Sequence, residues 1–409
     1  MLIIPNIVHI GEVFKMSSLP VIIPKDIDKY FFNRKKEIKQ INANLSLLDA
    51  NIANQLLITG YRGVGKTFLL KKILNDQPNK YLTAYIDLSK VYAGQKGELT
   101  EEEVIKEILN KINKTIEEDD KTFNQIKNTI SNFINQLKLK DYDLSNIKLS
   151  DIELPEIKSN YLKLSKFAMK LPQIIVDSSE DIKGFIIVID EFQLLKSLKN
   201  PEAFFWLIRS YTQEQFNVSY IFTGSVSQTG EIIRMINGQN GAFGGRMLQF
   251  NIDPFTKDQT EKYLNERLPS LKFTDDGFER FYSCTRGIPA YINSLSSILP
   301  TDVKCDEELI KEKLLLNVDQ IVIMWLYAWG TLSSIEKEII IFMVENEPVT
   351  WALLYNELNY AKSTITKYID SLLNKGIIEH TFDKKYILSD KMLKTWLEIK
   401  YENDGIYPA

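Results

Sequence analysis

The segment GYRGVGKT at residues 60–67 constrains the fold of this chain more than any other feature. It follows an apolar run at 55–59 that predicts a buried strand, and it precedes a helical pattern at 66–74. Glycines let successive backbone N–H groups turn towards one anion, and the positive end of the following helix points at the same place. The order of strand, loop and helix therefore predicts a phosphate-binding loop.

The apolar runs of the first 255 residues predict the fold class. They lie at 55–59, 82–87, 185–189, 218–223 and 247–252. Because helical stretches separate these runs, we predict an α/β domain over residues 31–255, with a parallel sheet covered by helices on both faces. Residues 1–30 form a lead-in with three prolines, and residues 93–180 interrupt the alternation and are interpreted as an inserted subdomain.

The pattern after residue 255 is helical. Residues 256–330 form one helical block, and residues 331–409 give three helices followed by a short strand pair around 377–388. That order predicts a winged-helix-like domain. Residues 331–409 contain nine Lys, no Arg and twelve Asp or Glu, so their net charge of −3 favours contact with protein over contact with DNA.

Two acids follow the third apolar run and complete the predicted phosphate site. Asp190 would hold Mg²⁺ from a neighbouring strand, together with the hydroxyl of Thr67. Glu191 would polarise the attacking water, and Lys66 would bridge β- and γ-phosphate oxygens. This combination is typical of enzymes that hydrolyse nucleoside triphosphates.

The fourth run ends in a further pair of polar residues, Thr223 and Ser225. A polar side chain that leaves the strand after the acidic one can contact the γ-phosphate or the lytic water. Both residues are candidates, and we assign Thr223 as the sensor. The alternative is that this segment is an ordinary strand end.

The composition excludes several other kinds of site. Cys284 and Cys305 are too few for a disulfide framework or a four-cysteine zinc site, and only two histidines, His9 and His380, are present. The longest apolar run has nine residues, at 321–329, against the ~18 that span a membrane, and the N-terminus lacks the basic segment of a signal peptide. We therefore expect a soluble, cytoplasmic protein without membrane contact.

Six segments give the chain a resemblance to the archaeal ATPase family, within the AAA+ and STAND branch of P-loop NTPases. They are FFNRKKEI at 31–38, GYRGVGKT at 60–67, IIVIDEFQ at 186–193, IFTGS at 221–225, FGGRMLQFNIDPF at 243–255 and TRGIPAYI at 285–292. The resemblance implies an ASCE/AAA+-like sheet with the phosphate-loop strand central, a helical lid at 256–330 and a C-terminal winged helix. It also implies ATP and Mg²⁺ as ligands.

The resemblance further implies which residues bind the nucleotide. Asn33 and Arg34 lie where such proteins line the adenine side of the pocket. The full predicted set is Asn33, Arg34, Gly60, Tyr61, Arg62, Gly63, Val64, Gly65, Lys66, Thr67, Phe68, Arg286 and Pro289. Thr67 and Asp190 form the predicted metal site, and Lys66, Glu191, Thr223 and Arg246 form the predicted catalytic set.

Two arginines have alternative interpretations. Arg246 stands in the family's GR motif, where it would stabilise transferred charge in cis or from a neighbouring subunit, or pair structurally with an acid such as Asp253. Gly287 and Pro289 match the lid motif that packs near the base. Arg286 departs from the family pattern, because many relatives carry glycine there, and it is either a phosphate sensor or a surface residue.

We interpret the chain as an Mg²⁺-dependent ATPase whose nucleotide state changes the angle between sheet domain and lid. One alternative is an ATP-dependent DNA-binding protein of the replication-initiator kind, with winged-helix contacts to DNA. Another is a switch that binds ADP tightly and waits for a partner. The expected partners are ATP and ADP, a protein bound through the winged helix or the insert, and further copies of the chain.

Overall fold

The computed structural model describes residues 23–408 and Leu19, with gaps at Glu98, Phe382 and 226–230 and across 118–160 apart from Thr129 and Asn132. The chain divides into two compact units. One joins Lys25–Pro254 with Met324–Ala409, and the other contains Phe255–Ile323. Within the described ranges, no helix combines the length and the apolar character that a bilayer crossing requires.

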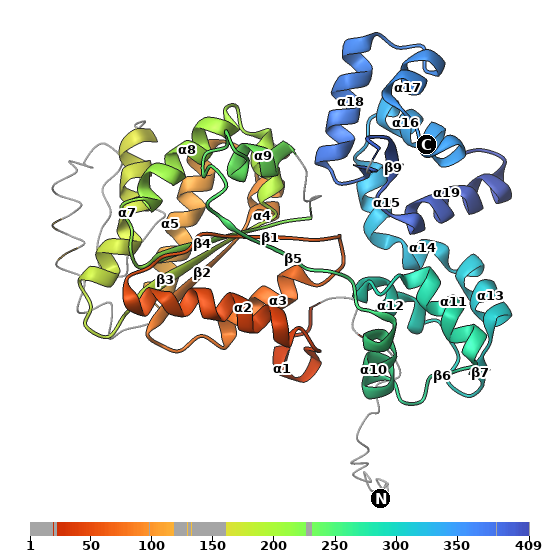
Figure 1. The fold of residues 1–409 in the computed structure, drawn as a ribbon, viewed down its shortest axis with the longest axis horizontal. Coiled ribbons are helices and arrows are strands. Elements are labelled where there is room, and N and C mark those ends of the chain that lie inside the picture. The colour runs from red at the N-terminus through yellow and green to blue at the C-terminus, as the bar shows by residue number, and fades with distance from the viewer. Residues whose placement is uncertain are drawn as a thin grey trace, which may run out of the picture. The chain divides into compact units, whose positions relative to one another are not determined.

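A five-stranded parallel sheet forms the centre of the first unit (Figure 1). Its strands are β1 (Leu56–Thr59), β2 (Tyr81–Asp87), β3 (Gly184–Asp190), β4 (Val218–Thr223) and β5 (Leu248–Asn251). They lie in the order β2-β3-β4-β1-β5. All five predicted runs are strands of this sheet, which confirms the predicted fold class. The strand that carries the glycine loop, β1, is an interior strand between β4 and β5.

Each face of the sheet packs against its own helices. One face shares a core with α2 (Lys35–Leu45), the 3₁₀ turn η1 (Ser46–Ala50) and α3 (Lys66–Asn75). The other is covered by α4 (Leu88–Gly94), α5 (Glu101–Glu117), α7 (Tyr161–Asp177), η2 (Phe192–Ser197), α8 (Pro201–Thr212) and α9 (Glu231–Asn237). Because side chains alternate along a strand, the β1 neighbours Leu57 and Ile58 belong to opposite cores. A short helix, α1 (Ile27–Tyr30), precedes α2.

The predicted insert is described only at its two ends. Its first helix, α5, buries an apolar stripe that includes Val104 and Ile108 against β2 and α7. Its last helix, α7, packs beside β3. Both helices thus belong to the layer that covers the sheet, while the part of the predicted insert at 118–160 lies outside the described residues, apart from Thr129 and Asn132.

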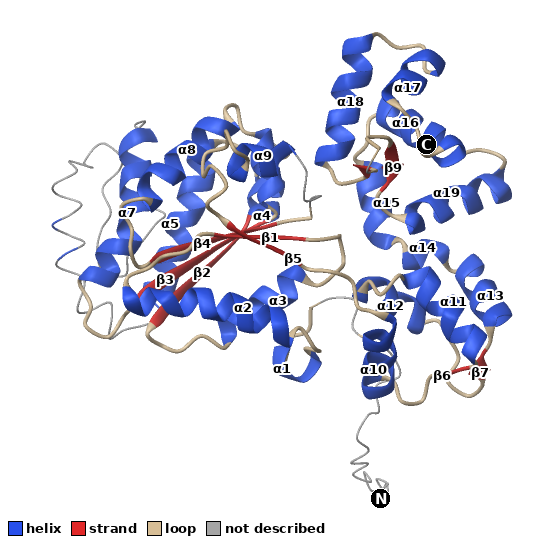
Figure 2. Ribbon diagram, in the orientation of Figure 1, coloured by secondary structure: helices blue, strands red, loops and turns tan. Residues whose placement is uncertain are grey.

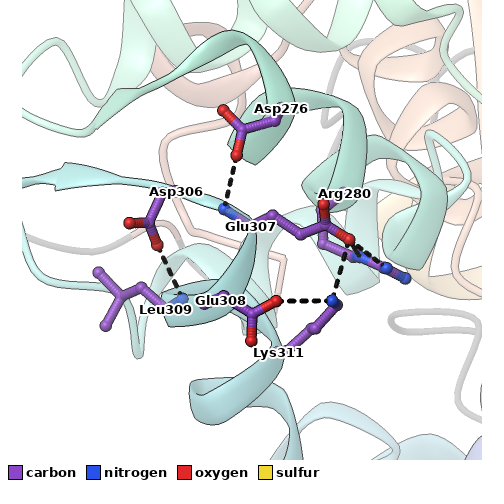
Figure 3. A network of polar contacts seen from close by, with 7 residues as sticks. All are labelled: Asp276, Arg280, Asp306, Glu307, Glu308, Leu309 and Lys311. Carbon is purple, nitrogen blue, oxygen red and sulfur yellow. Dashed lines mark hydrogen bonds and ion pairs between the residues drawn. The ribbon is translucent and has the colours of Figure 1, made fainter.

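The unit at Phe255–Ile323 is built from short helices. They are α10 (Lys257–Arg267), α11 (Asp275–Thr285), α12 (Pro289–Ser296), α13 (Glu307–Leu316) and α14 (Val318–Ile321), with the two-residue strands β6 (Lys272–Phe273) and β7 (Lys304–Cys305). A polar network joins α11 to α13 (Figure 3). Glu307 forms ion pairs with Arg280 and Lys311, and its backbone N–H donates to Asp276 at 3.3 Å. The network fixes the start of α13 against α11.

The C-terminal part is mostly helical (Figure 2). It contains α15 (Ile323–Gly330), α16 (Ser334–Asn346), α17 (Trp351–Glu357), α18 (Lys362–Asn374), the antiparallel strands β8 (Ile378–His380) and β9 (Tyr386–Leu388), and α19 (Lys391–Asp404). Three helices followed by a strand pair is the order predicted from the sequence. Trp329 of α15, which the sequence analysis placed in the block at 256–330, packs edge-on against Trp396 of α19, with ring centroids 5.7 Å apart.

Candidate functional site

The glycine loop connects β1 to the start of α3. Gly60, Gly63 and Gly65 have φ angles of 146°, 78° and 97°, a region that side chains with a Cβ rarely adopt. A Cβ at Gly60 would also lie 2.5 Å from the carbonyl oxygen of Ile252. The loop leads into a helix of ten residues that begins at Lys66, so the positive end of α3 faces the turn. The turn therefore suits an anion.

Lys66 is buried at the base of this turn, with 6% of its surface exposed. Its Nζ donates to the carbonyl oxygens of Gly60 and Tyr61, both at 2.9 Å, and to Ser225 Oγ at 3.0 Å. Burial lowers the pKa of Lys66 to about 8, although the charges of Glu191 and Asp190 oppose this shift. A phosphate would supply the full negative charge that the loop's carbonyl groups lack.

Thr67 and Asp190, the two predicted metal ligands, are in direct contact. Thr67 Oγ1 donates to Asp190 Oδ2 at 2.8 Å, and the backbone N–H of Glu191 donates to Asp190 Oδ1 at 2.8 Å. The expectation that Asp190 comes from a strand next to the loop strand is wrong, because β4 lies between β3 and β1. The contact forms across that strand because α3 packs over the sheet face that carries Val188, the same face as Asp190.

Tyr85 is a site residue that the sequence analysis missed. Its hydroxyl donates to Asp190 Oδ2. In the β2–β3 register, Tyr85 pairs with Val188 and Asp87 with Asp190, so Tyr85 shares a sheet face with Asp190. Burial, followed by the charge of Asp190, raises the pKa of Tyr85, which keeps the hydroxyl protonated as a donor. The signal in the sequence was the spacing of two residues between Tyr85 and the acid that ends its strand.

The oxygens of Thr67 and Asp190 fit Mg²⁺, which prefers hard oxygen ligands. Among the residues that the structure describes, no group of three or more His, Cys, Asp or Glu side chains could hold a metal ion by itself. An ion held by one hydroxyl and one carboxylate needs further oxygen ligands, and nucleotide phosphates supply them. The geometry thus fits a metal that arrives with its nucleotide.

Glu191 lies beside this pair in a constrained conformation. Its φ of 56° places it in the left-handed region, and its side chain accepts a hydrogen bond from Gln193 Nε2. Burial, followed by the charge of Asp190, raises the pKa of Glu191. A carboxylate with a raised pKa accepts a proton from water more readily than an ordinary one.

The two sensor candidates have different environments. Thr223 is fully buried at the end of β4, in register with Asp190, and its hydroxyl has no hydrogen-bond partner in the described part of the chain. Ser225, two residues later, contacts Lys66 directly. Thr223 therefore offers an unsatisfied hydroxyl near the acids, while Ser225 is the residue that reaches the lysine.

Arg34 supports the loop. Asn33 and Arg34 both have positive φ angles, of 60° and 61°, and they precede α2. The Arg34 side chain is buried and donates from Nη2 to the carbonyl oxygen of Val64 at 3.2 Å, while Nη1 pairs with Glu37 at 3.2 Å. Burial lowers the pKa of Arg34, and Glu37 opposes this shift. This contact links the segment before α2 to the middle of the glycine loop.

The other predicted loop residues differ in burial. Tyr61 and Arg62 are exposed, whereas Val64 is buried in the core beneath the loop. Phe68, the residue after Thr67, packs edge-on against Phe31, with ring centroids 5.4 Å apart. Phe68 thus joins α3 to the segment that carries Asn33 and Arg34.

Arg246 lies near the amino ends of the strands, whereas the glycine loop follows the carboxyl end of β1. Arg246 is exposed and comes just before β5, whose Leu248 pairs with Leu56 at the start of β1. Because the strands are parallel, the glycine loop follows the opposite end of β1. Within the described ranges Arg246 forms no ion pair with Asp253, which instead accepts a hydrogen bond from Asn251.

Two predicted residues belong to the unit at Phe255–Ile323. Arg286 ends α11 in a left-handed conformation, with a φ of 51°, and its backbone N–H donates to Tyr282. Pro289 is the first residue of α12. Between them, Gly287 has a φ of 71°, and a Cβ there would lie 1.8 Å from the carbonyl oxygen of Phe255, so this position requires glycine.

Several known proteins are similar to this chain in sequence or in fold. An uncharacterised ATP-binding protein of Methanocaldococcus jannaschii is 25% identical over 272 residues, which cover 64% of this chain and 68% of that protein. A Walker-type ATPase of Pyrococcus abyssi superposes with a TM-score of 0.59 at 19% identity, covering 90% of this chain and 96% of that one. The ORC1 protein of Aeropyrum pernix, solved with DNA, gives a TM-score of 0.46 at 12% identity, over 94% and 96% of the two chains. Residues 31–295 match the ATPase domain found predominantly in Archaea, and the chain belongs to this archaeal ATPase family.

Proposed function

We propose that this protein is an Mg²⁺-dependent ATPase whose nucleotide state controls the helical lid. The observation that carries the proposal is the contact of Thr67 with Asp190 at 2.8 Å, beside the buried Lys66 and the constrained Glu191. These four residues provide a cation that binds phosphate, two metal ligands and a general base. All four lie where β1 and β3 end. The segment with Asn33 and Arg34, which contacts the loop at Val64, is proposed to hold the adenine.

The residues divide the reaction among them. Lys66 exchanges its carbonyl partners for β- and γ-phosphate oxygens, and Thr67 and Asp190 would hold Mg²⁺. When bound, the metal neutralises charge on the phosphates. Glu191 takes a proton from the water whose oxygen bonds to the γ-phosphorus, and Thr223 contacts the γ-phosphate or that water. The bond from the γ-phosphorus to the β–γ bridging oxygen breaks, and ADP and phosphate leave.

The remaining predicted residues enter the proposal as regulators. Arg286 and Pro289 would contact the nucleotide from the lid, so loss of the γ-phosphate changes the lid equilibrium. Arg246 would act on the site of a neighbouring copy, because in its own chain it lies at the opposite end of the strands from the glycine loop. The C-terminal module is proposed to bind a protein partner, since its excess of acids disfavours duplex DNA.

Removal of Mg²⁺ tests this function. ATP hydrolysis, measured as phosphate release, is expected to stop in EDTA and to return when Mg²⁺ is added. Hydrolysis that persists in EDTA would contradict the proposed Mg²⁺ dependence.

A distance measurement between two dyes tests the proposed movement of the lid. In a protein with both cysteines replaced by serine, dyes on cysteines introduced at the exposed Glu202 and Glu261 are expected to report different distances with ADP and with a non-hydrolysable ATP analogue. Equal dye distances in both nucleotide states would contradict the proposed control of the lid.

The affinity for ATP is expected to fall as the pH rises from 7 to 9. Burial lowers the pKa of Lys66 to about 8 without nucleotide, whereas phosphates favour its charged form, so binding above that pH requires proton uptake. At pH 9 about one lysine in eleven remains charged, which weakens binding about tenfold. Titration calorimetry at both pH values measures this change, and Lys66→Arg, which stays charged, should remove most of it. Equal wild-type affinities would show that Lys66 does not titrate there.

A further inference from the structure

The turn after β3 reaches the end of β4 with two side chains, Phe192, which packs edge-on against Phe222, and Gln193. The Gln193 amide donates a hydrogen bond from Nε2 to the carboxylate of Glu191, and its Oε1 faces Gly224. Its Oε1 is buried and accepts no hydrogen bond from any residue that the structure describes. Gln193 therefore lies between the proposed general base and the segment that leaves the sensor strand.

Gly224 leaves the space that this amide occupies. A Cβ added at Gly224 would lie 2.0 Å from Gln193 Oε1, 3.0 Å from Phe192 Cδ1 and 3.2 Å from Gln193 Cδ, so the Gln193 amide would have to move. The φ of Gly224 lies outside the left-handed region that demands glycine. The space beside Gly224 is thus occupied by Gln193 and Phe192, and an added Cβ comes closest to the Gln193 amide oxygen.

Glu191 is held by one hydrogen bond at its backbone and one at the end of its side chain. Its backbone N–H donates to Asp190 Oδ1, and its carboxylate oxygen Oε2 accepts from Gln193. Without the second contact, the carboxylate would be free to rotate about its own side-chain bonds. Displacing a catalytic group by about 1 Å can slow a reaction by as much as 100-fold.

We propose that Gln193 is a positioning residue, which orients the Glu191 carboxylate towards the lytic water, and that Gly224 is glycine to admit the Gln193 amide. This inference rests on the proposed ATPase function. It adds a physical link between the two strand ends, because Ser225, the residue after Gly224, contacts Lys66.

Steady-state kinetics of four variants test the proposal. Gln193→Met keeps the length of the side chain and removes the donor, and Gln193→Ala removes the side chain. Both are expected to lower kcat between about 10- and 100-fold while KM and ATP affinity stay within about twofold, because the phosphate loop is untouched. Gly224→Ala, which displaces the amide, should lower kcat by a similar factor. Gly94→Ala, where an added Cβ meets nothing within 4 Å, is the matched control and should leave kcat unchanged.

The double variant separates positioning from general damage. If Gly224→Ala acts by displacing Gln193, adding it to Gln193→Ala should change kcat less than about twofold, so the two effects should not multiply. Multiplying effects, or a Gln193→Met protein with the kcat of wild type, would overturn the proposal. A wild-type protein that hydrolyses no ATP would remove the proposed function and this inference together, whereas an active wild type with unaffected Gln193 variants removes this inference alone.

Discussion

Glu191→Gln is expected to bind ATP as tightly as wild type and to hydrolyse it at least about 100-fold more slowly. The amide has nearly the shape of the carboxylate but cannot take a proton from water. Burial and the charge of Asp190 raise the pKa of Glu191, so this carboxylate accepts a proton from water more readily than an ordinary glutamate. Single-turnover hydrolysis of radiolabelled ATP measures the chemical step, and a fluorescent nucleotide measures binding.

The exposed Glu202 on α8 supplies a matched control, since Glu202→Gln makes the same chemical change away from the site. Its turnover should equal that of wild type. A Glu191→Gln protein that hydrolyses ATP at the wild-type rate would contradict the assignment of Glu191 as the base. Loss of both binding and turnover in that variant would instead indicate that Glu191 holds the nucleotide.

Lys66→Ala is expected to weaken ATP binding by at least about 100-fold, because Lys66 is the buried cation at the loop and would contact two phosphates. This variant should fold normally. At neutral pH the folded protein buries a charged lysine whose lowered pKa shows that burial disfavours its charge, and alanine removes that penalty. The melting temperature should therefore stay near that of wild type or rise, while nucleotide binding is lost.

Lys90→Ala is the corresponding control, because Lys90 is exposed on α4. It should change neither binding nor melting temperature. Tight ATP binding by a folded Lys66→Ala protein would show that the nucleotide binds elsewhere. Calorimetry of nucleotide binding, together with thermal unfolding of the same preparations, distinguishes these outcomes.

The parts of the fold that the sequence predicted are those set by local pattern. Each of the five strands is a short apolar run in the sequence. The turn at 60–67 needs glycines because its backbone adopts positive φ angles, and the apolar run before it and the helical pattern after it indicate such a turn. The three helices predicted in residues 331–409 include α18, which begins at Lys362 and ends at Asn374, shortly before Gly376 with its φ of 65°. The final helix α19 was not singled out, although Asp390 caps it.

The sequence could not predict the contacts that depend on the order and register of strands. The order β2-β3-β4-β1-β5 places β4 between the loop strand and Asp190, and no local pattern encodes that order. Tyr85 reaches Asp190 only because β2 pairs with β3 in one particular register. The contact of Gln193 with Glu191 forms beside a left-handed conformation of Glu191, which is unusual for a glutamate and which no local pattern indicates.

A crystal structure with Mg²⁺ and a non-hydrolysable ATP analogue would show where the nucleotide and the metal bind. We expect the γ-phosphate on Lys66 Nζ, the metal next to Thr67 and Asp190, and a water between Glu191 and the γ-phosphorus. A nucleotide bound away from the turn at 60–67, or a metal that neither Thr67 nor Asp190 approaches, would contradict this expectation.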